Sequence, residues 1–196
     1  KAGLGTSPIT SLAFVLTFIF PHSLGEFTML VNTVMFLIQA ALLGKAFGKV
    51  QLLQLPAALL FSACIDGWMY ILGFWKTGSY VGQVLMLLLG CVFLGLGIAF
   101  EVIPNVLILP GEGLVRVIAG LTGWRFGLVK TGFDMSIVAS AVGVSLFFTG
   151  HVLGIREGTV LAALIVGSIS HFFIEKVSNV LEGWIPDYSD AGDACP

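Results

Sequence analysis

The segment VGQVLMLLLGCVFLGLGIAF, residues 81 to 100, says most about the architecture of this chain. It runs for twenty residues without a charged side chain, and an α-helix of that length crosses the hydrocarbon core of a bilayer, roughly 30 Å. The whole chain agrees, since 57% of its 196 residues are hydrophobic, 10% are charged and the mean hydropathy is +1.03. Soluble domains carry about 25% charged residues. The sequence therefore predicts an all-α, polytopic membrane protein surrounded by the lipid bilayer.

Four other apolar windows predict further spanning helices. With the first, the predicted spans are residues 27–45, 52–74, 80–100, 128–149 and 157–175. Two weaker stretches do not cross a bilayer comfortably, because residues 9–20 end at Pro21 and residues 110–123 contain Glu112 and Arg116. We expect both to form short, broken helices.

The two weak stretches occupy matching places in an internal repeat. A shift of 102 residues, with a small gap in the next loop, aligns residues of the same or similar character: Pro8 with Pro110, Gly25 with Gly127, Asn32 with Asp134, and Asp66 with His171. Each half then has a short helix, a spanning helix, a basic loop and a second spanning helix. This order predicts one transmembrane domain, residues 1–176, with repeats at about 1–75 and 80–176, followed by an acidic tail, 177–196.

The repeat also predicts a helix that the chain lacks. The apolar helix 81–100 leads into the second short stretch through EVIPNVLILPGEG, residues 101–113. Its counterpart in the first repeat would precede Lys1. We therefore expect the first transmembrane helix to be missing.

The positive charges favour one of two topologies, because cytoplasmic loops are enriched in Lys and Arg. If both short helices crossed the bilayer, the charges would be almost evenly divided, with Lys76, Arg125, Lys130 and Lys176 opposite Lys45, Lys49 and Arg156. If both are re-entrant, six basic residues share one side against three: Lys45, Lys49, Arg116, Arg125, Lys130 and Lys176 against Lys1, Lys76 and Arg156. The second distribution predicts three spanning helices per half, two inverted repeats and a cytoplasmic C-terminus.

The glycine-rich start GLGTSP, residues 3–8, is the first candidate site. It lacks the GK[ST] ending and the preceding strand of a phosphate-binding loop. We instead expect a helix to begin here, with Ser7 as N-cap and Pro8 at the first helical position, and Pro110 to begin the second short helix. N–H groups at such helix starts inside a membrane would bind an anionic or polar group of a solute, or be satisfied by neighbouring helices.

Polar residues at membrane depth are the second set of candidates, because each costs a few kcal/mol when it faces lipid. Four of them lie at repeat-related positions on spanning helices: Asn32, Asp66, Asp134 and His171. One interpretation makes them solute contacts or a proton-responsive pair, with His171 titrating near neutrality. The other is a network of hydrogen bonds between helices.

Two pairs of opposite charge are spaced four residues apart, which places each pair on one helical face. They are Lys130 with Asp134, and Glu112 with Arg116. Ion pairing of Lys130 with Asp134 would weaken the case for Asp134 as a solute contact. Glu101 directly follows the apolar helix and is expected at the membrane interface.

The chain carries no pattern typical of an enzyme. It has no HExxH motif, no His and carboxylate cluster with metal-ligand spacing, and no serine nucleophile motif. Its basic residues are scattered singly, unlike those of a nucleic-acid-binding surface. We therefore expect a protein that is not an enzyme, without a metal or other cofactor and without a nucleic-acid partner.

The segment AGLGTSP, residues 2–8, the short apolar stretch and spanning helix after it, and the run GLGIAF, residues 95–100, resemble the YczE/YyaS/YitT-type family of bacterial integral membrane proteins. The likeness covers most of residues 2–171. The chain departs from the family pattern in lacking a helix before Lys1 and in carrying IPNVLILPGEG, residues 103–113, at the second turn. The resemblance implies a polytopic plasma-membrane protein and supplies no catalytic residues.

Together these features predict a small-solute transporter or permease of the bacterial inner membrane. Its site would lie at the midplane between the repeats and draw on both helix starts and the four polar residues: Ser7, Pro8, Asn32, Asp66, Pro110, Asp134 and His171. The solute would be small and polar or anionic, and the pattern specifies no oligomeric state. The alternative is a non-transporting scaffold, regulator or assembly factor, in which the polar residues pair with each other and leave no solvated cavity.

Overall fold

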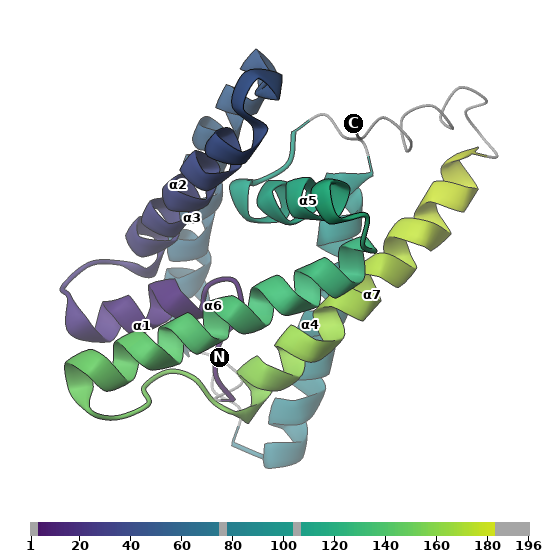
Figure 1. Ribbon diagram of the computed structural model, residues 1–196. Helices are drawn as coiled ribbons and strands as arrows, with labels where there is room; N and C mark the ends of the chain where they lie inside the picture. Colours follow the sequence, from purple (N-terminus) through teal and green to yellow (C-terminus); the bar gives the residue numbers. More distant parts are fainter. Residues whose placement is uncertain (1–3, 75–77, 104–106, 183–196) are drawn as a thin grey trace.

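The computed structural model describes residues 4–74, 78–103 and 107–182, and within these ranges every regular element is helical (Figure 1). The α-helices there are α1 (Ser11–Ile19), α2 (Leu24–Leu43), α3 (Gln54–Ile71), α4 (Tyr80–Val102), α5 (Pro110–Thr122), α6 (Phe126–Thr149) and α7 (Glu157–Glu182). Short 3-10 turns, Gly44–Ala46, Lys49–Leu53 and Leu72–Phe74, join or extend α2 and α3. The predicted all-α fold is confirmed.

Five of these helices are long and apolar enough to cross a bilayer. The spans are Leu24–Ala46, Lys49–Ile71, Tyr80–Val102, Phe126–Thr149 and Glu157–Ser178. They confirm the five predicted spanning helices. At its C-terminal end α7 continues to Glu182, into the segment expected as a tail, and residues 183–196 of that tail lie outside the described part of the chain.

The two weak stretches form the short helices α1 and α5, as predicted. Their 9 and 13 residues correspond to roughly 14 and 20 Å of helix, well short of the hydrocarbon core. Helix α5 begins at Pro110, as expected. The expected start of α1 is wrong, because its N-cap is Thr10 and its first residue is Ser11. The hydroxyl groups of Thr10 and Ser11 donate to the carbonyl oxygens of Ser7 (3.2 Å) and Pro8 (2.6 Å), which holds this segment in a turn before the helix.

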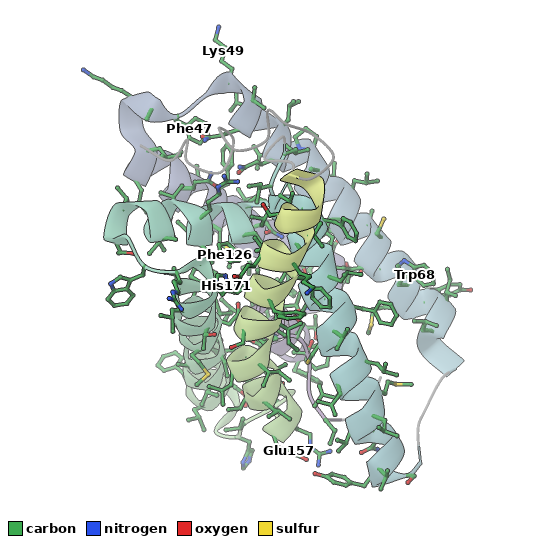
Figure 2. All side chains as sticks on the ribbon, turned by 90° about the vertical axis from the view of Figure 1, so that its right-hand side faces the viewer. Phe47, Lys49, Trp68, Phe126, Glu157 and His171 are labelled. Atoms are coloured by element: carbon green, nitrogen blue, oxygen red, sulfur yellow. The ribbon has the colours of Figure 1, made fainter. Side chains whose placement is uncertain are left out.

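The long helices run between two opposite ends of the molecule. In Figure 1 the connection between α2 and α3 and the C-terminal end of α7 lie at the upper end, whereas the connection between α6 and α7 lies at the lower end. Figure 2 accordingly has Lys49 at the top and Glu157 at the bottom. A topology with spanning short helices would put Lys49 on the same side as Arg156, the neighbour of Glu157. The arrangement therefore agrees with re-entrant short helices, and the inverted relation of the two repeats stays a prediction.

The two halves are interlocked through their short helices. Helix α1 packs against α6, and α5 packs against α2. The most extensive helix pair is α4 with α7, which encloses an apolar cluster of Cys91, Ile98, Ala162 and Val166. A site beside the short helices consequently draws on residues far apart in the sequence.

Two glycines at the starts of α2 and α6 permit close helix packing. A side chain at Gly25 would collide with the Ser62 carbonyl oxygen, and a Cβ at Gly127 would lie 2.7 Å from the carbonyl oxygen of Gly167 and 3.0 Å from Cβ of His171. Glycine is the residue that allows backbones to approach this closely. The two glycines that the sequence shift aligned thus make comparable contacts in the two halves.

The surface of the molecule is apolar and its interior holds charged groups. Large side chains such as Leu60, Leu128 and Phe147 are more than 65% exposed, whereas Lys130 and Asp134 are each 1% exposed. A contiguous apolar exterior of this kind is typical of a membrane-facing surface. It supports the assignment of the long helices to the bilayer.

Candidate functional site

A cavity of about 260 Å³ lies between the turn before α1 and the helices α2, α4 and α5, with one wall residue from α3. Helices α1 to α3 belong to the first predicted repeat, and α4 and α5 lead into the second. Most of the lining is apolar. The polar residues of the lining are Thr10, Thr28, Asn32, Glu101 and Glu112.

Asn32 borders the cavity from α2, on the same helical face as Thr28. Its Nδ2 atom donates to the Thr28 carbonyl oxygen at 3.0 Å, and the Thr28 hydroxyl donates to the Leu24 carbonyl oxygen at 2.7 Å. Bonds of this type let short polar side chains sit in a membrane helix without facing lipid. They leave Asn32 Oδ1 without a donor among the described residues.

Two carboxylates meet at the start of α5. The backbone N–H of Leu109, the N-cap, donates to Glu101 Oε1, and Glu112 lies in the first turn of the helix. The positive end of the helix dipole favours negative charge at this position. Glu101 of α4, which we expected at the membrane interface, therefore lines the cavity together with Glu112. At this helix start the sequence predicted either an anionic or polar group of a solute or a partner from a neighbouring helix. For the Leu109 N–H the partner is Glu101, from the neighbouring helix α4.

Behind the cavity, Lys130 of α6 joins two carboxylates in a buried triad. Its Nζ atom lies 2.8 Å from Asp134 Oδ1 and 3.4 Å from Glu112 Oε1. The three side chains are only 2%, 1% and 8% exposed, respectively. The pairing of Lys130 with Asp134 matches the predicted spacing on one helical face. Glu112 belongs both to this triad and to the cavity lining.

The expected ion pair between Glu112 and Arg116 is wrong. Glu112 faces the buried ammonium of Lys130, whereas Arg116 is half-buried and donates from Nη1 to the Val102 carbonyl oxygen at 3.3 Å. A buried carboxylate gains more from an ammonium that is also buried, because the attraction is little screened there. The packing of α5 on α6 thus overrides the local spacing.

The turn at Ser7 and Pro8, where the sequence predicted the first helix start, lies beside α7. The backbone N–H of Thr6 donates to Thr159 Oγ1 at 3.0 Å, and the N–H of Gly158 donates to the Leu4 carbonyl oxygen at 3.0 Å. Pro8 is fully buried, and the Ser7 hydroxyl oxygen is buried without a hydrogen-bond partner among the described residues. Neither residue lines the cavity, although the adjacent Ile9 and Thr10 do.

Asp66 and His171 lie beside the starts of α2 and α6 and away from the cavity lining. Asp66 accepts hydrogen bonds from the Ser23 hydroxyl (2.6 Å) and the Gly25 N–H (2.8 Å), so it ties α3 to the N-terminus of α2. His171 of α7 packs against Gly127, and Figure 2 shows it next to Phe126. The structure therefore does not bring the predicted site residues into one site.

Of those residues, Asn32 reaches the cavity directly, Asp134 is linked to it through Lys130 and Glu112, and Pro110 lies between two lining residues. Sequence reasoning missed Glu101 and Glu112 as lining residues. The sequence signal for them was one carboxylate directly after an apolar helix and a second carboxylate in the first turn after a helix-starting proline. Thr10 and Thr28 gave no signal, since threonines are common in membrane helices.

Within the described ranges, no group of three or more His, Cys, Asp and Glu side chains is placed to hold a metal ion.

Comparison with known proteins groups this chain with membrane proteins. Residues 1–175 match a family described as a family of unknown function, DUF6198. The chain is also similar to the uncharacterized membrane protein YczE of Bacillus subtilis (strain 168), with 26% identity over 193 residues that cover 98% of this chain and 84% of the relative. No solved structure matches the chain significantly. The resemblance to YczE-type membrane proteins is confirmed, and this multi-pass membrane protein belongs to the DUF6198 family.

Proposed function

We propose that the protein is a small-solute transporter or permease of the bacterial inner membrane, with its binding site in the cavity between the turn before α1 and the helices α2, α4 and α5. The observation that carries the proposal is a cavity of about 260 Å³ that is shared by both halves and lined by Asn32, Glu101 and Glu112 among apolar residues. Transporter sites typically lie at the interface of two repeats, beside broken helices. The Lys45 to Lys49 connection and the C-terminus face the cytoplasm, and the protein performs no chemical step.

The free-energy cost of polar side chains at membrane depth supports a solute site in the cavity. Ionisable and amide side chains at membrane depth each cost a few kcal/mol unless they are paired or face a polar cavity. Glu112 and Asn32 are only 6% and 7% exposed, yet both line the cavity. A mostly apolar pocket with a few polar groups is the usual form of a small-molecule site.

Accessibility of Asn32 to water-soluble reagents tests whether the cavity opens to either side of the membrane. In a background with Cys64→Ser, Cys91→Ala and Cys195→Ser, Asn32→Cys is expected to react with a membrane-impermeant thiosulfonate at least tenfold faster than Ser170→Cys. Ser170 is fully buried and lies outside the cavity lining, so it is the matched control. Equal rates would contradict a solvated site.

Solute movement is the second readout. Vesicles that contain the purified full chain are transferred into hyperosmotic glycerol, alanine, succinate or butylammonium chloride, and re-swelling is followed by light scattering. We expect faster re-swelling than in empty vesicles with at least one solute, and loss of that difference in Asn32→Leu. No acceleration with any solute would count against transport.

The alternative function, a non-transporting scaffold or regulator, is favoured by the internal pairing of two predicted site residues. Asp66 is bonded to Ser23 and Gly25, and Asp134 is bonded to Lys130. A scaffold needs only such pairing, and it predicts that the Asn32→Cys thiol stays unreactive from both sides. The labelling experiment therefore separates the two functions.

A further inference from the structure

We infer that the solute of the proposed transporter is a small protonated amine with an apolar body, bound by Glu101, Glu112 and Asn32. The inference rests on the proposed function and specifies its substrate class. The sequence predicted a small polar or anionic solute, and the inference selects a polar, cationic one. Three observations carry it: the hydrogen-bonding capacity left open in the cavity, the balance of charge around it, and its apolar walls.

The polar groups of the cavity are mostly acceptors once their own bonds are counted. The hydroxyls of Thr10 and Thr28 already donate to the carbonyl oxygens of Ser7 and Leu24. Asn32 uses one amide N–H on Thr28, and its Oδ1 receives no hydrogen bond from the described residues. Asn32 keeps a second N–H, but most of the open positions are acceptors, so a ligand with several donors fits them best. An ammonium group offers three donors and no acceptor.

The carboxylates add to this excess of acceptors. Glu101 Oε1 accepts from the Leu109 N–H, and Glu112 Oε1 accepts from Lys130. In each case the second carboxylate oxygen receives no hydrogen bond from the described residues. A carboxylate oxygen that borders a mostly apolar cavity gains most from a charged donor.

The balance of charge around the cavity also favours a cationic ligand. Glu101, Glu112 and Asp134 face a single buried ammonium, that of Lys130. Arg116 donates from Nη1 to the Val102 carbonyl oxygen and forms no ion pair in the described part of the chain. Even with its positive charge included, the three carboxylates outnumber the two cations. A bound cation reduces the excess of negative charge, whereas a bound anion would add to it in surroundings of low dielectric constant.

The triad shows that the site already accommodates one ammonium group. Lys130 Nζ lies closer to Asp134, at 2.8 Å, than to Glu112, at 3.4 Å. Of the two partners of Lys130, Glu112 is therefore held less tightly, and it is also the one that borders the cavity. A solute ammonium on the cavity side can share Glu112 with Lys130 while Lys130 keeps its shorter contact with Asp134.

The remaining walls suit the hydrocarbon part of such a solute. Met35, Leu94 and Ile98 line the cavity, and Phe61 and Phe93 contribute aromatic rings to it. Aromatic faces attract cations in addition to burying apolar surface. A volume of about 260 Å³ lies at the small end of ligand cavities and limits the solute to a few carbon atoms.

A series of ligands that share a four-carbon chain and differ in their polar group tests the inference on the full chain in detergent. The midpoint of thermal unfolding is measured with butylammonium, 1-butanol, butyrate and butyltrimethylammonium, which differ in charge and in N–H donors. We expect butylammonium to raise the midpoint in a saturable manner, with an apparent affinity at least tenfold above that of the other three ligands. Equal or tighter binding of butyrate or 1-butanol would overturn the proposal.

Two variants assign the binding to the carboxylates. Glu112→Gln and Glu101→Gln are each expected to weaken butylammonium binding at least tenfold. Glu101→Gln keeps an oxygen for the Leu109 N–H and leaves the Lys130 triad intact, so its result stands even where Glu112→Gln destabilises the fold. Glu157→Gln, at an exposed carboxylate outside the cavity, is the matched control and should bind normally. Undiminished binding in Glu101→Gln would contradict the assignment.

The substrate class and the transport function fail in different ways. If the vesicle assay detects movement of glycerol, alanine or succinate while butylammonium neither binds nor moves, transport stands and the amine is wrong. If butylammonium binds through Glu101 and Glu112 but no solute in the panel moves, the amine site stands and transport is wrong.

Discussion

Lys130 Nζ lies 3.4 Å from Glu112 Oε1, and this buried contact ties the spanning helix α6 to the first turn of the short helix α5. Asp134, one turn further along α6, receives the same ammonium at 2.8 Å. The helix start that borders the cavity is therefore positioned from behind by an ion triad. The stability of the protein and the shape of the cavity therefore both depend on Lys130, Glu112 and Asp134.

Removing the ammonium should destabilise the protein strongly. Lys130→Met leaves two buried carboxylates without their partner, and the expected loss is about 3–5 kcal/mol of unfolding free energy. The measurement is reversible unfolding of the purified protein in detergent with increasing denaturant. Glu157→Gln, which breaks an exposed ion pair with Arg156, is the control and should cost less than about 1 kcal/mol. A loss no larger than that of the control would show that the triad contributes little to stability.

Asp66 is expected to act on stability rather than on solute binding. It accepts two hydrogen bonds at the start of α2, from Ser23 and Gly25, and it does not line the cavity. Asp66→Ala should therefore cost about 1–3 kcal/mol and leave butylammonium binding unchanged. A double-mutant cycle with Ser23→Ala should give a coupling energy above about 0.5 kcal/mol, because the two side chains are bonded directly. Normal stability combined with lost binding would instead place Asp66 in the solute site.

The two aligned glycines should tolerate no side chain. Gly25→Ala brings a methyl group against Ser62 and Asp66, and Gly127→Ala brings one against Gly167 and His171. Overpacking of this kind costs about 1–3 kcal/mol. Gly132→Ala is the matched control on α6, because nothing lies within 4 Å of the added carbon, and there alanine should be neutral or stabilise by up to about 1 kcal/mol. Thermal unfolding of the three variants makes the comparison, and similar midpoints for all would contradict the close packing.

The ends of the molecule should lie on opposite sides of the membrane. In the background without native cysteines, Lys49→Cys is expected to react with an impermeant thiol reagent from the cytoplasmic face, and Glu157→Cys from the other face. The physical reason is the enrichment of basic residues in cytoplasmic loops, together with the separation of these two positions in Figure 2. Labelling of right-side-out and inverted vesicles measures it. Reaction of both thiols from one face would favour short helices that span.

The spanning helices were predictable because membrane insertion is largely a local property. In hydrocarbon a helix satisfies its own backbone hydrogen bonds, so an uncharged run such as residues 81–100 is sufficient to specify it. The two stretches that are too short to cross were recognisable by their length in the same way. The first residue of α1 was not, because the hydroxyls of Thr10 and Ser11 bond back to the turn before the helix.

Partners across helices were only partly predictable. Lys130 and Asp134 pair as their spacing suggests, since both lie on one face of one helix. Glu112 and Arg116 have the same spacing, but α6 offers Glu112 a buried ammonium and the two residues separate. A spacing of four residues shows which side chains can pair on one helix. Whether they do pair depends on the partners that the neighbouring helix offers.

The amino-acid sequence alone accounts for the membrane class, the five spans, the two short helices and the correspondence of Gly25 with Gly127, because each depends on composition or on local order. The cavity and its chemistry come from the packing of helices. Glu101 and Asn32 are distant in the chain and approach a common space only where α4, α2 and α5 meet. Burial then makes the charge of each lining carboxylate important, because in a low-dielectric interior a carboxylate must be matched by a donor or a cation.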